Sequence, residues 1–179
     1  KLAAHTGRAA KRMADLTGAQ AQTIHRLLEV DFSGGNTFKR NEENPLQCDA
    51  VIIDEMSMVD TMLFASLLKA LKGSTRLIMV GDSNQLPSVG AGNILRDLID
   101  SGQVPMVELT EIFRQAAKSL IVTNAHSIIH GDVPELNDRT NDFFFMPSDS
   151  EENTLRLVIE LCKTRLPKAY GYDPLDDIQ

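Results

Sequence analysis

The sequence predicts an α/β fold with a mainly parallel sheet, buried on both faces by flanking helices. Two observations carry this prediction: short apolar runs alternate with segments of helical periodicity, and two of the runs end in acidic residues. The run at 50–53 leads into Asp54 and Glu55, and the run that begins at Thr75 leads into Asp82. Ligands of such sheets bind beyond the carboxyl ends of the strands, so these acids stand where the fold places its chemistry.

The N-terminal third predicts a strand, two helices and a polar insert. Residues 1–4 are expected to be the end of a strand, followed by a helix that Thr6 caps and that ends at Gly18. A short second helix is expected at 23–30. The Gly- and Asn-rich stretch 31–47 predicts a small hairpin or an exposed loop.

The rest of the chain continues the alternation. Helices are expected to begin after caps such as Asp60 and to end before Gly73, Gly102 and Gly131. The expected strands lie at 50–53, 75–82, 105–110 and 142–147, and the expected helices at 61–71, 93–101, 117–130 and 151–165.

Length, cysteine content and charge exclude several classes of protein. With 179 residues, 42% of them hydrophobic, the chain is long enough for one core. Cys48 and Cys162 lie far apart without a CxxC pattern, which argues against a zinc site or a disulfide framework and indicates a cytoplasmic location. There is no apolar run of membrane-spanning length. The net charge of -7 does not suggest nucleic acid as a partner, although an acidic protein can carry a local basic groove.

An acidic pair at the end of a buried strand is the Walker B arrangement. The Asp, here Asp54, holds Mg²⁺ through water, and the neighbouring Glu55 can accept a proton from the attacking water. Gln85, a long neutral amide just past the second strand, suits contact with a γ-phosphate, and the glycines of the loop after it allow movement and close approach to a ligand. The plainer alternatives are solvated carboxylates that cap the next turn and an exposed loop amide.

Five segments, in order over residues 1–121, resemble motifs of superfamily-one helicases, most closely the RecD-like ATP-dependent DNA helicases (the exodeoxyribonuclease V alpha-chain family). The segments are LAAHTGRAAKRM (motif Ia), TIHRLLE (the DNA-contacting helix after it), VIIDEMSMVD (motif II), LIMVGDSNQLPSVGAGNIL (motif III) and LTEIFRQA (motif IV). His5 departs from the pattern, since many relatives have Pro before this Thr-Gly-Arg.

The resemblance implies a RecA-like P-loop NTPase sheet. Three motifs of the family are nevertheless missing from this sequence. The family's phosphate-binding loop, GxxxxGK[ST], precedes motif Ia, and no such segment occurs in the chain; motifs V and VI are missing as well. We therefore expect a piece of a larger helicase, truncated before the P-loop strand and inactive alone. Residues 1–170 would form part of the first RecA-like motor domain, with the hairpin insert at 31–47, and 171–179 would begin the connection to the second.

On the nucleotide side, the resemblance implies ATP and Mg²⁺ as cofactors and names their ligands. Asp54 would hold Mg²⁺, Glu55 would position or deprotonate water, and Gln85 would sense the γ-phosphate. Arg114 would stabilise charge on the transferring phosphoryl group, where the alternative is an exposed Arg at a helix start. Asp82 is expected to be structural or an outer-shell partner.

On the DNA side, the resemblance implies phosphate contacts from Thr6, Arg8, Thr23 and His25. For His25 the alternative is a histidine packed in the core. Lys11 and Arg12 either add further phosphate contacts or form a solvated helix face. Phe32 and Phe38 either pack the base of the hairpin or belong to an inserted subdomain that lies beside DNA.

For the parent protein we expect ATP hydrolysis coupled to movement on single-stranded DNA, with 5′-to-3′ polarity by analogy. The implied partners are single-stranded DNA, duplex junctions and RecBCD-like nuclease subunits, without a membrane. The rival class is a non-catalytic module, derived from a motor domain, that binds nucleic acid or protein. An RNA-directed relative is a third possibility, against which the RecD-like motifs argue.

Overall fold

The computed structural model describes residues 1–31, 37–109, 118–138, 140 and 142–178. The chain divides into two compact units, Lys1–Leu109 and Thr110–Gln179, and each is described by itself. Among the described residues, no helix has the length and apolar character needed to cross a membrane.

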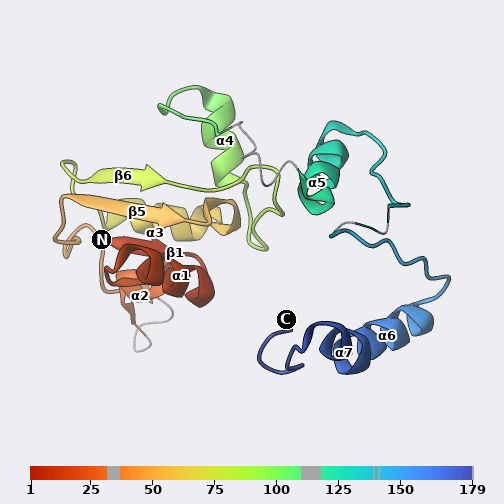
Figure 1. Cartoon of the computed structure of the whole chain (residues 1–179). Helices are drawn as coiled ribbons and strands as arrows, with labels where there is room; N and C mark the ends of the chain where they lie inside the picture. The colour runs from red at the N-terminus through yellow and green to blue at the C-terminus, as the bar shows by residue number, and fades with distance from the viewer. Residues whose placement is uncertain (32–36, 110–117, 139, 141, 179) are drawn as a thin grey trace. The chain divides into compact units, whose positions relative to one another are not determined.

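The first unit is built on a four-stranded sheet with the order β2-β1-β5-β6, and all neighbouring strands in it run parallel. The strands are β1 (Leu2–Ala4), β2 (Ala21–Thr23), β5 (Ala50–Asp54) and β6 (Arg76–Met79), of which β1, β5 and β6 are labelled in Figure 1. The predicted parallel sheet with flanking helices is confirmed. The sequence prediction missed β2, because its residues form no apolar run that marks a strand.

The helices of this unit begin and end where local chemistry predicts. They are α1 (Gly7–Thr17), α2 (Ile24–Leu28), α3 (Thr61–Lys69) and α4 (Ile94–Ser101). The Thr6 hydroxyl accepts a hydrogen bond from the backbone N–H of Ala9 at 3.2 Å, and the Asp60 carboxylate accepts one from Leu63 at 2.8 Å. Gly18 ends α1 in the left-handed conformation, with φ 67°. Both predicted caps are confirmed.

The core lies beside the central strand. Val51 and Ile53 of β5 are fully buried, and Ala3 of β1 lies opposite Ile53 on the same face. Ile24 and Leu28 of α2 and Leu67 of α3 belong to the same buried cluster. The strand that ends in Asp54 is therefore held from both sides by hydrogen bonds and on one face by apolar packing.

The polar insert forms a small hairpin, as predicted. Strands β3 (Val30–Asp31) and β4 (Thr37–Phe38) pair antiparallel, with Val30 opposite Phe38. Arg40 forms an ion pair with Glu29 at 2.6 Å beside the base of the hairpin. Phe38 packs against the core cluster, as the base-packing interpretation expects, whereas Phe32 lies outside the described residues.

The second unit contains α5 (Leu120–His130), α6 (Glu151–Glu160), a π-helical turn η3 (Leu161–Arg165) and α7 (Leu166–Tyr170). The helix predicted at 151–165 thus continues to Tyr170. Asn124 of α5 is buried, and its amide exchanges two hydrogen bonds of 2.8 Å with the backbone of Glu135. These bonds fix the segment that follows α5.

Two predicted strands are wrong. The described residues of 105–110 and the range 142–147 form no strand. Val107 and Leu109 are 87% and 93% exposed, and Phe144 is 54% exposed. An apolar run becomes a strand only when a neighbouring strand completes its backbone hydrogen bonds, and none pairs with the described residues of these runs.

Candidate functional site

The carboxyl ends of three strands meet at one edge of the sheet. Ala4, the last residue of β1, lies opposite Thr23 of β2 on one side and Asp54 of β5 on the other. Beyond the register of β5 and β6, Met56 N–H donates to the Val80 carbonyl oxygen at 3.0 Å. The predicted acid pair therefore stands at the middle of this edge.

Asp54 and Glu55 form a strained turn. Asp54 ends β5, and Glu55 adopts the left-handed conformation, with φ 59° and ψ 43°, before a 3₁₀ turn η1 (Met56–Met58). That conformation costs a non-glycine residue about 1–2 kcal/mol. The Asp54 carboxylate offsets part of the cost, since its Oδ1 accepts a hydrogen bond from the Glu55 N–H at 2.9 Å. Strain of this kind concentrates at functional sites.

The pair also fits the magnesium ion that the resemblance implies. Mg²⁺ keeps several waters and takes one or two protein carboxylates together with substrate phosphates. Both side chains are half-buried, so they reach solvent at the strand end. Among the described residues no group of three His, Cys, Asp or Glu side chains surrounds a common point, and a Mg²⁺ ion held largely by water and phosphates needs no such group.

The loop after β6 runs directly beside the acid pair. A side chain on Gly81 would place its Cβ 3.0 Å from the Met56 nitrogen and 2.9 Å from Leu95 Cδ2. Both distances are shorter than ordinary packing allows. A side chain at position 81 would therefore force the Leu95 side chain and the backbone at Met56 to shift, and glycine avoids this.

Asp82 shapes the turn that carries Gln85. Its Oδ1 accepts a hydrogen bond from the Asn84 N–H at 2.9 Å, and its Oδ2 accepts one from Gln85 Nε2 at 3.4 Å. The Gln85 side chain is exposed. These bonds give Asp82 the structural role that was one of its two expected roles, while its outer-shell role and the contact of Gln85 with a phosphate stay predictions.

The glycine-rich segment after Gln85 packs tightly on the start of α3. Thr61 N–H donates to the Ala91 carbonyl at 3.0 Å. A Cβ on Gly90 would lie 2.3 Å from Asp60 Oδ2, and one on Gly92, whose φ is +97°, would lie 2.0 Å from Thr61 Oγ1. The sequence suggested that these glycines allow movement, whereas their role in the structure is close packing. We name this contact between 88–92 and Asp60-Thr61 the loop latch.

The predicted DNA-contacting threonines lie at the same edge as the acids. Thr6 caps α1 and Thr23 caps α2, where its hydroxyl accepts a hydrogen bond from Arg26 N–H at 3.3 Å. A capping hydroxyl uses a lone pair and keeps its proton for another acceptor. Arg8 is exposed on the first turn of α1. Their phosphate contacts stay predictions.

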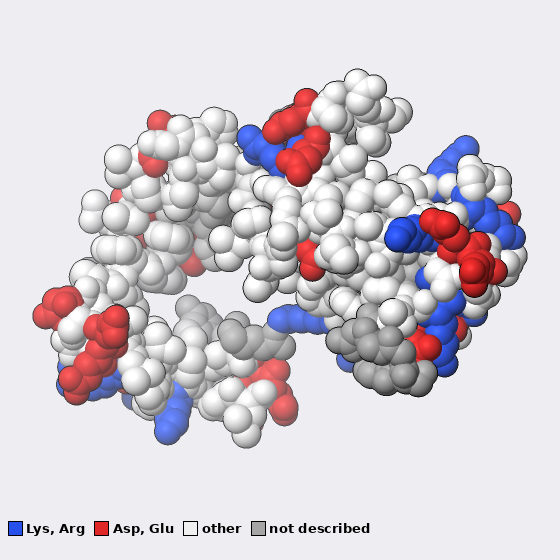
Figure 2. Space-filling view, turned by 180° about the vertical axis from the view of Figure 1, so that it is seen from behind, with Lys and Arg blue, Asp and Glu red and all other residues white. Residues whose placement is uncertain are grey.

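His25 is exposed on α2, so the packed-core alternative for this residue is wrong. Its ring contacts Phe38, with centroids 6.0 Å apart, and His5, with centroids 6.3 Å apart. Lys11 and Arg12 are exposed on α1. On the face drawn in Figure 2, the coloured Lys and Arg side chains are interspersed with Asp and Glu, as on a solvated surface.

Arg114 lies outside the described residues, so the fourth predicted nucleotide contact stays a prediction.

The structure adds two residues that sequence reasoning did not assign. His5 Nδ1 and Ser57 Oγ are buried without a hydrogen-bond partner in the described part of the chain. The only sequence signal for either was the departure from the motif at position 5.

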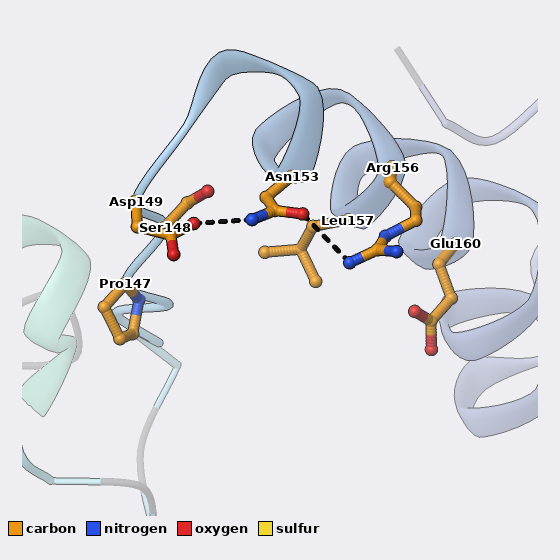
Figure 3. A pocket seen from close by; sticks show the side chains of 7 residues that line it. All are labelled: Pro147, Ser148, Asp149, Asn153, Arg156, Leu157 and Glu160. Atoms are coloured by element: carbon orange, nitrogen blue, oxygen red, sulfur yellow. Dashed lines mark hydrogen bonds between the residues drawn. The ribbon is translucent and has the colours of Figure 1, made fainter.

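A surface pocket in the second unit contains none of the predicted site residues. Figure 3 shows its lining side chains, among which Asn153 donates to Asp149 at 2.5 Å and accepts from Arg156 Nη2 at 2.9 Å. These polar groups satisfy one another. The candidate site is therefore the edge of the sheet in the first unit.

A protein-family model described as an AAA domain matches residues 1–91. The chain belongs to this family. It is 37% identical over 158 residues to the ATP-dependent RecD2 DNA helicase of Deinococcus radiodurans, a match that covers 88% of this chain and 21% of that protein. It is 39% identical over 115 residues to the RecBCD enzyme subunit RecD of Mycolicibacterium smegmatis, covering 55% of this chain and 21% of that protein. The resemblance to RecD-like helicases is confirmed.

A solved structure of Pif1 helicases at forked double-stranded DNA shares the fold. It has a TM-score of 0.50 and 22% sequence identity, and the match covers 89% of this chain and 40% of that chain. The RecA-like fold class is therefore confirmed. The chain spans about a fifth of the length of the two curated relatives named above.

Proposed function

We propose that this chain is part of an ATP-driven DNA helicase or translocase that hydrolyses ATP and moves along single-stranded DNA. One observation carries the proposal: the carboxylate pair Asp54-Glu55 stands at the carboxyl end of the central strand β5, hydrogen-bonded through Met56 to the strand end that leads to Gln85. The names of the RecD-like relatives support DNA as the track. The 5′-to-3′ direction is proposed by analogy.

In this proposal each residue at the edge has one task. Asp54 would hold the magnesium ion, and Glu55 would orient the attacking water and accept its proton. ATP bound with Mg²⁺ supplies the phosphoryl group that is transferred to water. Gln85, held by Asp82, contacts the γ-phosphate region, and Arg114 stabilises the charge that develops there.

The DNA contacts would come from the neighbouring strand ends. Thr6 and Thr23 would donate their hydroxyl protons to phosphate oxygens, and Arg8 and His25 would add positive charge or N–H donors. Such contacts carry no sequence information, which suits a motor that moves along any sequence. RecBCD-like subunits are proposed as partners from the name of one relative, and duplex junctions are proposed as a further substrate without support from the relatives' names.

The second candidate is a non-catalytic module, derived from a motor domain, that binds nucleic acid or protein. The 179 residues contain no GxxxxGK[ST] segment to cradle phosphates. We therefore expect these residues alone to bind ATP–Mg²⁺ weakly and to be inactive. In the module hypothesis the complete protein would show the same behaviour.

The test is carried out on the complete protein that contains this chain. ATP hydrolysis is measured with and without single-stranded DNA, and strand separation is measured on duplexes that carry either a 5′ or a 3′ overhang. The proposal expects DNA-stimulated hydrolysis and unwinding from the 5′ overhang. Binding of DNA without hydrolysis would favour the module, and unwinding only from the 3′ overhang would contradict the proposed direction.

A further inference from the structure

Three aromatic rings from separate segments of the first unit contact one another. His5 follows β1, His25 lies on α2, and Phe38 belongs to β4 of the hairpin. The centroid of the His25 ring lies 6.3 Å from that of His5, with an interplanar angle of 76°, and 6.0 Å from that of Phe38, with an angle of 53°. Both arrangements are direct aromatic contacts. We name these three side chains the ring cluster.

The fold holds the ring cluster in place and leaves one of its rings in solvent. Arg40 N–H donates to the Leu28 carbonyl at 3.0 Å, which ties the strand that carries Phe38 to the end of α2. Phe38 is half-buried and packs against the core. His25 is exposed, although its ring contacts two neighbours. An exposed ring with a fixed position can receive another planar group on its face.

The charge of the segment that carries the ring cluster indicates which planar group fits. Residues 1–40 contain seven Lys and Arg against three Asp and Glu, whereas residues 41–179 contain eleven against 22. Six of the seven cations are exposed, and Arg40 is half-buried in its ion pair with Glu29. A ligand that combines planar rings with negative charge matches both features. Unpaired nucleotides are such a ligand, because their bases stack on aromatic side chains while cations contact their phosphates.

We propose that the ring cluster is a stacking surface for the unpaired bases of single-stranded DNA, with the exposed ring of His25 as the contact and with His5 and Phe38 as its supports. The inference rests on the proposed function and names the part of the DNA that this site contacts. Stacking uses the face of the His25 ring, so the nitrogens at its edge can still donate to a phosphate. Every base has a π face, so the contact is independent of sequence. In a duplex the neighbouring base pairs cover these faces, so the surface distinguishes single strands from duplexes.

The experiment measures the affinity of the complete protein for two fluorescein-labelled strands by fluorescence anisotropy. One strand is an oligo-dT, and the other has equal length with abasic sites in place of its bases. His25→Phe keeps a ring face but has no N–H donor, and His25→Gln keeps an N–H donor but has no ring. His126→Phe and His126→Gln are the matched controls, because His126 is exposed on α5 of the second unit.

The ratio of the two affinities isolates the contribution of the bases, since both strands carry the same phosphates. We expect the wild type to bind oligo-dT about fivefold or more tightly than the abasic strand, and His25→Gln to lose most of this ratio. His25→Phe should keep the ratio within about twofold of the wild type, as should both controls. Phe38→Leu keeps an apolar side chain against the core but removes a supporting ring, so it should lower the ratio as well. If Phe38→Leu fails to fold, judged by its thermal transition, the exposed His25 variants decide the outcome.

Three results would overturn the inference while leaving the proposed function intact: equal wild-type affinity for the two strands, a wild-type ratio in His25→Gln, or the same loss of the ratio in His25→Phe as in His25→Gln. The second would show that His25 contacts no base, and the third that its nitrogens and not its ring face contact the base. A wild-type protein that binds neither strand would instead refute the proposed function, and the inference with it.

Discussion

Substitution of Gly92 by Ala should release the loop latch. The new Cβ would stand 2.0 Å from Thr61 Oγ1 in a backbone with φ +97°, so the folded loop would carry both a clash and a left-handed non-glycine residue. Overpacking costs about 1–3 kcal/mol, and the backbone conformation costs a similar amount. Lifting the loop instead gives up the hydrogen bond from Thr61 N–H to Ala91, worth about 0.5–1.5 kcal/mol, and the nearby contacts of Ser88.

Detachment of the loop costs less free energy than keeping the clash and the left-handed alanine, so we expect the loop to detach in Gly92→Ala. The cost is about 1–2 kcal/mol, which corresponds to a factor of roughly 5–30 in the local opening equilibrium. Amide hydrogen exchange at Thr61 reports this directly, because its N–H loses its acceptor. Gly73→Ala is the control, since a Cβ at Gly73 meets nothing within 4 Å. Unchanged exchange at Thr61 in Gly92→Ala, or equal acceleration in Gly73→Ala, would refute the latch.

Three further predictions concern the site and the two units. In the complete protein, Gln85→Ala should weaken unwinding more than nucleotide affinity, and Arg114→Ala should cut the ATPase rate itself; normal unwinding by either variant would remove its assigned role. Asn124→Ala should destabilise the second unit by about 1–3 kcal/mol in urea unfolding, because the two hydrogen bonds of 2.8 Å between the Asn124 amide and the backbone of Glu135 are lost, and a loss below the error of the measurement would contradict this. The lowered pKa of His5 means that the folded state binds fewer protons, so this contribution to stability is complete above about pH 6.5 and is lost as the pH falls from there. His5→Gln should therefore lose less stability than wild type between about pH 7.5 and about pH 5.5, and identical pH profiles would show that His5 does not titrate as described.

Local chemistry was readable from the sequence. Thr6 and Asp60 cap helices because a short oxygen side chain before a helix accepts an orphan N–H, and Gly18 ends a helix because it tolerates positive φ. The position of Asp54 at the edge of the sheet could be predicted because the apolar run directly before it marks a buried strand. These features depend on neighbours within a few residues.

Features that depend on distant neighbours were not readable. The apolar run around Val107 could have formed a strand, but strand formation requires a partner that composition does not reveal. The packing role of Gly90 and Gly92 depends on Asp60 and Thr61, which precede them by some thirty residues. The unpartnered nitrogen of His5 is likewise a property of the packed structure.

The central claim is that Glu55 accepts the proton of the attacking water, and its most direct test is Glu55→Gln in the complete protein. The amide keeps the shape of the side chain but cannot accept the proton. Equilibrium ATP binding and steady-state ATP hydrolysis are measured for the wild type, for Glu55→Gln and for the control Glu42→Gln, whose side chain is exposed beside the hairpin. We predict near-normal ATP affinity with a loss of hydrolysis of about a hundredfold or more in Glu55→Gln, and wild-type behaviour in the control. Hydrolysis by Glu55→Gln near the wild-type rate would contradict the assignment.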